Sequence, residues 1–203
     1  RKGTGGGGMK KAERMQVYEK YGGHCIDPQR LYTDKAIIVI TTALILVLPL
    51  VALSPPTWQS HLQFTPLDIP LDPEIQEFAF YLCHEYNVNF LLLMAVIKTE
   101  SNYRADLISS SGDYGLMQIN TVNHGWIKEN LKLPDMLNPY QNIQAGVYMI
   151  SDLINKYGTI EKALMAYNLG ESGANALWRG GVYETRYVRV VMEKWRELKG
   201  VTE

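Results

Sequence analysis

The chain lacks an excess of charge of either sign, and it holds few cysteines. Its net charge is −1 at pH 7 over 203 residues, so its composition does not indicate a nucleic-acid partner, which a strongly basic protein would suggest. Its two cysteines could form one disulfide bond at most, which excludes a framework of several disulfides. No internal repeat is visible either. Hydrophobic residues make up 46% of the chain, an ordinary fraction for a globular protein with a core of its own.

One long hydrophobic run is present, from Ala36 to Leu53, and it holds no charged residue. Its eighteen residues would extend about 27 Å as a helix, close to the ~30 Å hydrocarbon core of a bilayer. We expect an uncleaved transmembrane anchor. A cleaved signal peptide and a buried helix are the alternatives, although "VALSPP" offers only a poor cleavage site. Residues 1–35 hold 8 Lys/Arg against 4 Asp/Glu, which places this end in the cytosol and residues 54–203 outside, in an extracellular or periplasmic space.

The anchor divides the chain into four predicted parts. They are a basic cytosolic tail over 1–35 that is partly disordered, the transmembrane anchor over 36–53, a Pro-rich spacer over 54–72, and an outer domain over 73–200. Cys25 and Cys83 then lie on opposite sides of the membrane and cannot pair. The outer domain must therefore be held together by its hydrophobic core.

The tail contains a stretch, "AERMQVYEKYGGHC" (Ala12–Cys25), that resembles the beginning of HNH-type nucleases, where such a sequence leads into a Cys-x-x-Cys zinc pair. Here Cys25 is followed by "IDP", and no second thiol arrives. Cys25 and His24 alone cannot complete a tetrahedral zinc site. We therefore predict neither a metal site nor a nuclease, and we interpret the stretch as part of a basic tail.

The outer domain has the sequence pattern of a mainly α protein. Its first helix begins at Pro73 with Asp72 as N-cap, and "NFLLLMAVIKTE" (89–100) is apolar on all sides, as expected of a central buried helix. Residues 101–116 are rich in Ser and Gly and predict turns with a small hairpin. Further helices are expected over 139–158 (ended by Gly158), 160–168 (capped by Thr159), 171–178 and 184–198. The predicted fold class is mainly α (α+β): a helical bundle around a central buried helix, with a small β-hairpin or irregular lobe, preceded by one transmembrane helix.

A single carboxylate, Glu100, stands at the end of the apolar helix. The segment from Phe90 to Ile97 carries no charge, so an acid at its edge either marks a helix end at the surface or is kept protonated. An apolar wall raises the pKa of a carboxyl group, and the negative end of a helix dipole acts in the same direction. The acid of hen-type lysozymes works in this way. Such a group can donate a proton to a glycosidic oxygen at neutral pH.

Four short blocks occur in order along the outer domain: "TES" (99–101), "GLMQI" (115–119), "AYNLG" (166–170) and "ETRYVRVV" (184–191). Together they resemble the Slt-type lytic transglycosylases, which belong to the lysozyme-like superfamily and are related to goose-type lysozymes. The resemblance covers roughly residues 73–195. It implies a lysozyme-like fold and an enzyme that cleaves peptidoglycan.

The resemblance also implies roles for individual residues. Glu100 would be the sole catalytic acid and base. The substrate-binding residues would be Ser101 (beside the cleft), Met117, Gln118 (hydrogen-bonded to the glycan), Tyr167, Asn168 and Tyr187 (its hydroxyl close to Glu100). Without Glu100, Met117 and Tyr167 would be explained equally well as core residues, and Asn168 as a helix C-cap. The chain departs from many members in having "NVN" without proline before the catalytic helix and "NTVN" after "GLMQI", which leaves the conformation of the substrate lip open.

The number of carboxylates separates two mechanisms, because a hydrolytic glycosidase normally uses two. Asp106 and Asp113 are the other acids between Glu100 and Asn120, and both stand in a Ser/Gly-rich context typical of turns. With Glu100 alone, the resemblance implies proton donation to the bond between N-acetylmuramic acid and N-acetylglucosamine, followed by closure of a 1,6-anhydro ring. With Asp113 as a second carboxylate, the protein would be a hydrolytic muramidase. Neither mechanism requires a cofactor.

A third interpretation is a non-catalytic protein that only binds peptidoglycan during the assembly of a larger apparatus. The set of Glu100, Gln118 and Tyr167 favours an enzyme. The predicted partners are peptidoglycan glycan strands and the membrane, through Ala36–Leu53. A tethered single-domain enzyme suits local opening of the wall for a conjugation apparatus, a secretion apparatus or a phage, and the residues do not select among these three.

Overall fold

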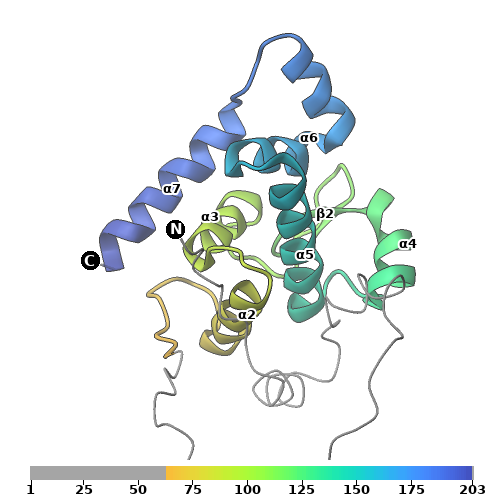
Figure 1. The fold of residues 1–203 in the computed structure, drawn as a ribbon. Coiled ribbons are helices and arrows are strands. Elements are labelled where there is room, and N and C mark those ends of the chain that lie inside the picture. Colours follow the sequence, from red (N-terminus) through yellow and green to blue (C-terminus); the bar gives the residue numbers. More distant parts are fainter. Residues whose placement is uncertain (1–62, 203) are drawn as a thin grey trace, which may run out of the picture.

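The computed structural model describes residues 63–202 (Figure 1). In chain order the elements are α2 (Pro73–Glu85), α3 (Phe90–Glu100), β1 (Asp113–Tyr114), β2 (Ile119–Asn120), α4 (His124–Trp126), α5 (Pro139–Tyr157), α6 (Ile160–Arg179) and α7 (Arg186–Thr202). A 3₁₀ turn over Thr121–Asn123 and a π-helical turn over Ile127–Leu131 flank α4. β1 and β2 form a two-stranded antiparallel sheet. The prediction of a mainly α domain with a small hairpin is confirmed.

The predicted tail, the predicted anchor and the first part of the predicted spacer, residues 54–62, lie outside the described residues. Over residues 63–202, none of the helices combines the length and the apolar character needed to cross a bilayer. The anchor at Ala36–Leu53 therefore stays a prediction.

The last residues of the predicted spacer pack onto the domain. The rings of Phe64 and Phe80 lie 5.5 Å apart between centroids, and Leu71 is buried. The side-chain amide of Gln76, which is also buried, donates to the carbonyl oxygens of Leu71 (2.7 Å) and Leu67 (3.3 Å). These contacts extend the packed part of the chain on the N-terminal side of α2, as far as Phe64.

Side-chain caps fix the beginnings of the helices. Asp72, Asn89 and Thr159 each accept a hydrogen bond from a backbone amide in the first turn of the helix that follows. Gly158 ends α5 with a φ of 75°, a left-handed conformation that costs glycine little. The positions of Asp72, Gly158 and Thr159 at these boundaries were predicted from the sequence.

Helix α3 lies at the centre of the described domain, between α7, α2 and α5 (Figure 1). Its residues from Leu92 to Ile97 are at most 1% exposed. It packs against α7 and α2, while α5 packs against α2 and α6. Because α3 is apolar on all sides, its middle stays in the core. Both ends reach the edge of the core: Phe90 and Leu91 are half-buried, and so is Glu100 at the C-terminal end.

The prediction of two helices over 160–168 and 171–178 is confirmed. The element α6 contains both, and they are separated at Gly170, whose φ of 69° and ψ of 158° are not helical. Figure 1 shows the second half of α6 projecting away from the rest of the domain. Helix α7 continues beyond the predicted end at 198, and the sequence had given no structure for the turns around α4.

Candidate active site

Glu100 is the last residue of α3 and lines a cavity of about 450 Å³. Burial is the main cause that raises the pKa of its carboxyl group from 4.5 to about 7. A hydrogen bond from the Tyr187 hydroxyl lowers this pKa, the charge of Asp113 raises it, and the charge of Lys194 lowers it. A large share of the carboxyl groups is therefore protonated at neutral pH. The apolar segment that precedes Glu100 had predicted this direction.

Tyr187 reaches Glu100 from α7, and its hydroxyl donates to Glu100 Oε1 over 2.6 Å. Burial, the charge of Glu100 and this hydrogen bond hold the pKa of Tyr187 well above 10. The phenol therefore stays protonated and remains a hydrogen-bond donor at every pH at which the domain would work. The resemblance had implied this proximity, and the structure places the two groups in direct contact.

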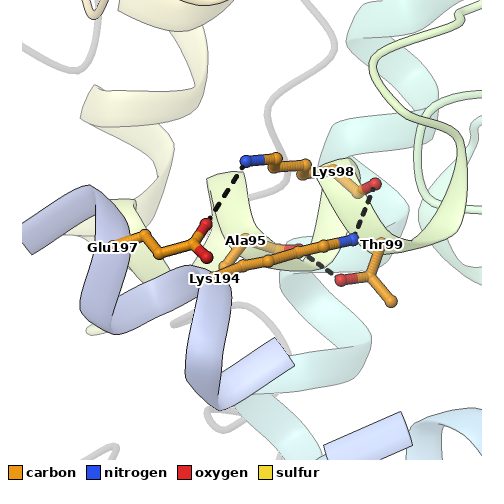
Figure 2. Close-up of polar contacts among 5 residues, drawn as sticks. All are labelled: Ala95, Lys98, Thr99, Lys194 and Glu197. Carbon is orange, nitrogen blue, oxygen red and sulfur yellow. Dashed lines mark hydrogen bonds and ion pairs between the residues drawn. The ribbon is translucent and has the colours of Figure 1, made fainter. Parts of the chain in front are cut away.

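The last turn of α3 is held on α7 by polar contacts, which Figure 2 shows. Lys194 Nζ donates to the carbonyl oxygen of Lys98 over 3.3 Å, and Lys98 Nζ lies 3.5 Å from Glu197 Oε2. Within α3 itself, the Thr99 hydroxyl donates to the Ala95 carbonyl oxygen over 2.8 Å. The Lys98–Glu197 pair is solvent-accessible, so we expect it to contribute little, about 0–1 kcal/mol. Lys194 matters more for the site, because it satisfies a helix-end carbonyl and brings a positive charge near Glu100.

The block "GLMQI" forms a turn, and the side chain of Asn142, on α5, is hydrogen-bonded to its backbone. Asn142 is 0% exposed. Its amide nitrogen donates to the carbonyl oxygens of Tyr114 (2.8 Å) and Met136 (2.9 Å), and its amide oxygen accepts from the Met117 backbone amide (2.8 Å). One buried side chain thus satisfies two backbone groups at this turn and one in the segment before α5, each of which would be costly to leave unpaired.

Two glycines allow this turn to approach α5 closely. Gly115 has a φ of 72°, and a Cβ there would lie 2.6 Å from both Asn142 Nδ2 and the Met136 carbonyl oxygen. A Cβ at Gly146 would lie 2.1 Å from Met117 Sδ. The Met117 side chain therefore occupies the space that Gly146 leaves open on α5. Met117 is 0% exposed and anchors the loop from within.

Tyr167, from the block "AYNLG" in α6, connects this helix to the same loop. Its hydroxyl donates to the Met117 carbonyl oxygen over 2.9 Å, and burial, with the charges of Glu100 and Asp113, holds its pKa well above 10. The four sequence blocks are therefore brought together in space: Tyr187 contacts Glu100, and Tyr167 contacts the "GLMQI" turn.

The predicted site residues divide into those that line the cavity and those that support it. Glu100, Gln118, Tyr167 and Asn168 line it. Ser101 and Met117 are buried and are not among the lining residues; Ser101 Oγ donates to the carbonyl oxygen of Ile97 over 3.2 Å. Tyr187 meets the cavity through its bond to Glu100.

Gln118 is bound to its own loop. It has a φ of 48°, and its amide nitrogen donates to the carbonyl oxygens of Gly115 (2.9 Å) and Leu107 (3.2 Å). A primary amide has two N–H donors and one carbonyl oxygen. With both donors engaged by the loop, the amide oxygen is the atom through which Gln118 could bind a glycan.

Asp113 lines the same cavity as Glu100 but stands in a polar cluster. Its Oδ2 accepts from Ser109 Oγ (2.7 Å) and Ser111 Oγ (2.6 Å), and its Oδ1 accepts from the Asn120 amide (2.7 Å). Burial acts to raise the pKa of Asp113, but these hydrogen bonds outweigh it and lower the pKa below 3.8. The carboxylate is therefore ionised at neutral pH.

Several lining residues were not predicted from the sequence. Asn120, Val122, Met149 and Leu169 are among the other residues that line the cavity. Val122 and Leu169 are exposed apolar side chains, at 83% and 41%, and an apolar rim of this kind suits the C–H faces of sugar rings. Over residues 63–202, no cluster of His, Cys, Asp and Glu side chains could hold a metal ion.

The sequence of this domain is similar to those of known proteins. The family described as "Transglycosylase SLT domain" matches residues 78–186. The "Transglycosylase" of Enterobacteria phage PRD1 is 31% identical over 91 residues, which are 45% of this chain and 33% of the phage protein. "Invasion protein IagB" of Salmonella typhimurium strain SL1344 is 30% identical over 123 residues, 58% of this chain and 74% of IagB. IagB of Salmonella typhi is 30% identical over 120 residues, 56% and 72% of the two chains. The chain thus spans about a third of the phage protein and about three quarters of IagB.

Proposed function

Because the chain belongs to the transglycosylase SLT domain family, we propose that it cleaves peptidoglycan with Glu100 as the single acid and base. Family membership confirms the resemblance seen in the sequence, and with it the expected class of enzyme, a lytic transglycosylase. The bond cleaved would be the β-1,4 linkage from N-acetylmuramic acid to N-acetylglucosamine. The product would carry a 1,6-anhydro ring on its muramoyl end.

The first step is protonation of the glycosidic oxygen. Glu100 Oε1 accepts the Tyr187 hydrogen bond, which leaves Oε2 to carry the acidic proton. With a pKa of about 7, the carboxyl group is a sufficiently strong acid and about half of the molecules still hold the proton at neutral pH, which is the condition for general acid catalysis. As this proton moves to the glycosidic oxygen, the C1–O bond breaks and the N-acetylglucosamine residue leaves with a free hydroxyl group.

The second step closes the anhydro ring. The muramoyl C6 hydroxyl forms a bond to the cationic C1, and its proton returns to Glu100, which is now a carboxylate. No water is consumed, and the acid is regenerated. An intramolecular hydroxyl has a high effective concentration and can outcompete water. Tyr187 supports this step because its hydroxyl stabilises the carboxylate form between the two proton transfers.

The observation that carries the proposal is the state of Glu100: a carboxyl group with a pKa raised to about 7, at the edge of a cavity that the matched sequence blocks line. The hydrolytic alternative also has an observation in its favour, since Asp113 is an ionised carboxylate in the same cavity. However, three hydrogen bonds make Asp113 a weak base, which favours electrostatic stabilisation of the cation over activation of a water molecule.

Mass spectrometry of digested peptidoglycan distinguishes the two mechanisms. We expect muramoyl ends that are lighter by one water than reducing ends, for wild type and for Asp113→Asn. Reducing ends from wild type would contradict the single-acid mechanism and establish hydrolysis.

We also propose that Ala36–Leu53 tethers the enzyme to the membrane, with the domain described here on the outer side. The excess of Lys and Arg before this run supports the orientation. The names of the relatives, a phage transglycosylase and an invasion protein, support local opening of the wall for a phage or a secretion apparatus. Fractionation of cells that express the full chain tests the proposed membrane anchor. The protein should be recovered with the membranes and be released only by detergent. Release by high salt would contradict the proposal.

A further inference from the structure

Three phenylalanine rings gather at the N-terminal end of α3, where the described part of the chain begins. Phe64 precedes α2, Phe80 lies on α2 and Phe90 is the first residue of α3. The Phe64 ring lies 5.5 Å from that of Phe80 and 6.1 Å from that of Phe90, between centroids, and the rings of Phe80 and Phe90 are 5.6 Å apart. All three residues are half-buried, so part of this aromatic cluster lies on the surface.

Helix α7 adds a tryptophan and a lysine to the cluster. The Trp195 indole Nε1 donates to Asn89 Oδ1 over 3.0 Å, and Asn89 is the N-cap of α3. Lys199 Nζ lies 3.7 Å from the centre of a Trp195 ring, which is a cation–π distance, and Lys199 is exposed. Together five residues form a surface, the aromatic base: Phe64, Phe80, Phe90, Trp195 and Lys199.

The aromatic base and Glu100 lie at opposite ends of α3. Helix α7 runs antiparallel to α3, because Tyr187 contacts Glu100 at one end and Trp195 contacts Asn89 at the other. The eleven residues of α3 place the two ends about 15 Å apart along the helix axis. In Figure 1 the segment before α2 and the C-terminal end of α7 lie at one end of the domain, away from the second half of α6. A surface that covers the aromatic base therefore leaves the cavity at Glu100 open.

The predicted membrane anchor ends close to the aromatic base in the sequence. Leu53 and Phe64 are eleven positions apart, which is at most about 40 Å of fully extended chain. A bilayer is therefore the surface that a tethered domain meets most often, at a high effective concentration. Aromatic rings with lysine beside them are the side chains that proteins place at the level of lipid headgroups. The composition of the aromatic base fits that boundary.

We propose that the aromatic base docks on the outer surface of the membrane that holds the anchor, with its rings at the level of the lipid headgroups and Lys199 beside their phosphate groups. This inference rests on the proposed anchor at Ala36–Leu53. The contact turns the Glu100 end of α3 away from the bilayer and toward the peptidoglycan. It orients the enzyme and takes no part in the chemical step.

The test uses the full chain in vesicles of phosphatidylethanolamine and phosphatidylglycerol in equal parts, and in matched vesicles whose acyl chains carry bromine, which quenches nearby indoles. The chain has four tryptophans, so the fluorescence difference between the parent and Trp195→Phe isolates the signal of Trp195. This signal should be weaker in the brominated vesicles.

Trp178→Phe is the matched control. Trp178 is half-buried, as Trp195 is, and its indole Nε1 also has a hydrogen-bond acceptor, Met165 Sδ over 3.3 Å. Because Trp178 lies in the second half of α6, its signal should be the same in both kinds of vesicle. Circular dichroism confirms that each variant is folded.

Charge reversal provides a second variant. Lys199→Glu should lower the ratio of docked to undocked domains by about fivefold or more, since each basic residue near an anionic surface contributes roughly that factor. Lys128→Glu makes the same exchange at an exposed position on the π-helical turn after α4, which Figure 1 shows on the other side of the domain from α7. It should leave the quenching of Trp195 unchanged.

The outcomes separate docking from anchoring, because flotation with the vesicles measures the anchor by itself. If the parent floats but the Trp195 signal is equal in both kinds of vesicle, the aromatic base does not meet lipid and the docking proposal is overturned. If the parent does not float, the anchor is contradicted and the docking proposal falls with it. Thr65→Cys, at an exposed position beside Phe64, tests another occupant. More disulfide-linked dimer than in the parent, together with an unquenched Trp195, would assign the base to a second copy of the chain.

Discussion

Glu100 and Asp113 line one cavity, yet their surroundings are opposite. Glu100 ends an apolar helix, and burial raises its pKa to about 7. Asp113 lies in a hairpin where two serines and Asn120 donate to it, and these bonds lower its pKa in spite of burial. The charge of Asp113 adds to the rise at Glu100. The difference shows that the local sequence around each carboxyl, and not their shared cavity, decides which one holds a proton.

Replacing the Glu100 or the Asp113 carboxyl group by an amide tests this difference, and the loss at Glu100 should be the largest effect on cleavage activity. Glu100→Gln should lower cleavage of purified sacculi by about 10²–10⁴-fold, since the proton donor is lost. Asp113→Asn should cost about tenfold or less, the effect of a lost electrostatic contact, and should leave the anhydro products unchanged. Release of soluble fragments measures both. Equal losses in the two variants would show that both carboxyls act chemically.

Tyr187→Phe removes the hydrogen bond from the Tyr187 hydroxyl to Glu100, a phenol contact that has no counterpart at Asp113. The Tyr187 hydrogen bond stabilises the carboxylate form, so its loss should raise the pKa of Glu100 further and slow the step in which the carboxylate acts as a base. We expect activity at neutral pH to fall by about tenfold, the effect of one hydrogen bond to a charged group. The descending limb of the pH–rate profile should move to higher pH. A shift to lower pH would contradict the role given to Tyr187.

Stability should depend on pH through Glu100 in a defined direction. Its pKa is higher in the folded protein, about 7, than the ordinary value of 4.5. The folded state therefore binds the proton more tightly, and this stabilisation is complete below pH 4.5 and lost as pH rises through 7.

Glu100→Gln removes this dependence. The variant should be more stable than wild type at pH 8, by on the order of 2 kcal/mol, and nearly equal to it at pH 4. Urea unfolding at the two pH values measures the difference, with Asp113→Asn as the matched control. That control should be less stable than wild type by a similar amount at both pH values, because the pKa of Asp113 is lowered on folding from 3.8 and its contribution is lost only below about pH 4. A stability difference for Glu100→Gln that is independent of pH would contradict the account.

Of the variants considered, Lys194→Met should have the smallest effect on the pH–rate profile. The positive charge of Lys194 lowers the pKa of Glu100, but it ranks last among the causes. Its removal should move the descending limb of the pH profile slightly upward, by less than Tyr187→Phe does, and leave the maximal rate unchanged. A loss of maximal rate would show that Lys194 positions the last turn of α3 rather than only tuning its charge.

The structural features that depend on neighbouring residues in the chain could be predicted from the sequence. The amphipathic and apolar periods predicted α2, α3 and α5, and the caps at Asp72 and Thr159 were found where expected. The apolar wall before Glu100 predicted the direction of its pKa shift. These features follow from neighbours within a few residues along the chain.

What the sequence could not predict depends on contacts between distant segments. Asn142 holds a loop that lies 25 residues earlier in the chain, and nothing in its own helix distinguishes it from a surface amide. Trp126 and Tyr148 come together from two elements, so neither residue predicts this ring contact by itself.

Direct titration of the Glu100 side chain is the most decisive measurement. Carbon NMR of the glutamate carboxyl groups, with Glu100→Gln to assign the signal, follows its ionisation against pH. We predict a pKa of about 7 in the folded protein. A pKa near the ordinary 4.5 would mean that Glu100 is ionised at neutral pH, and it could not then serve as the acid.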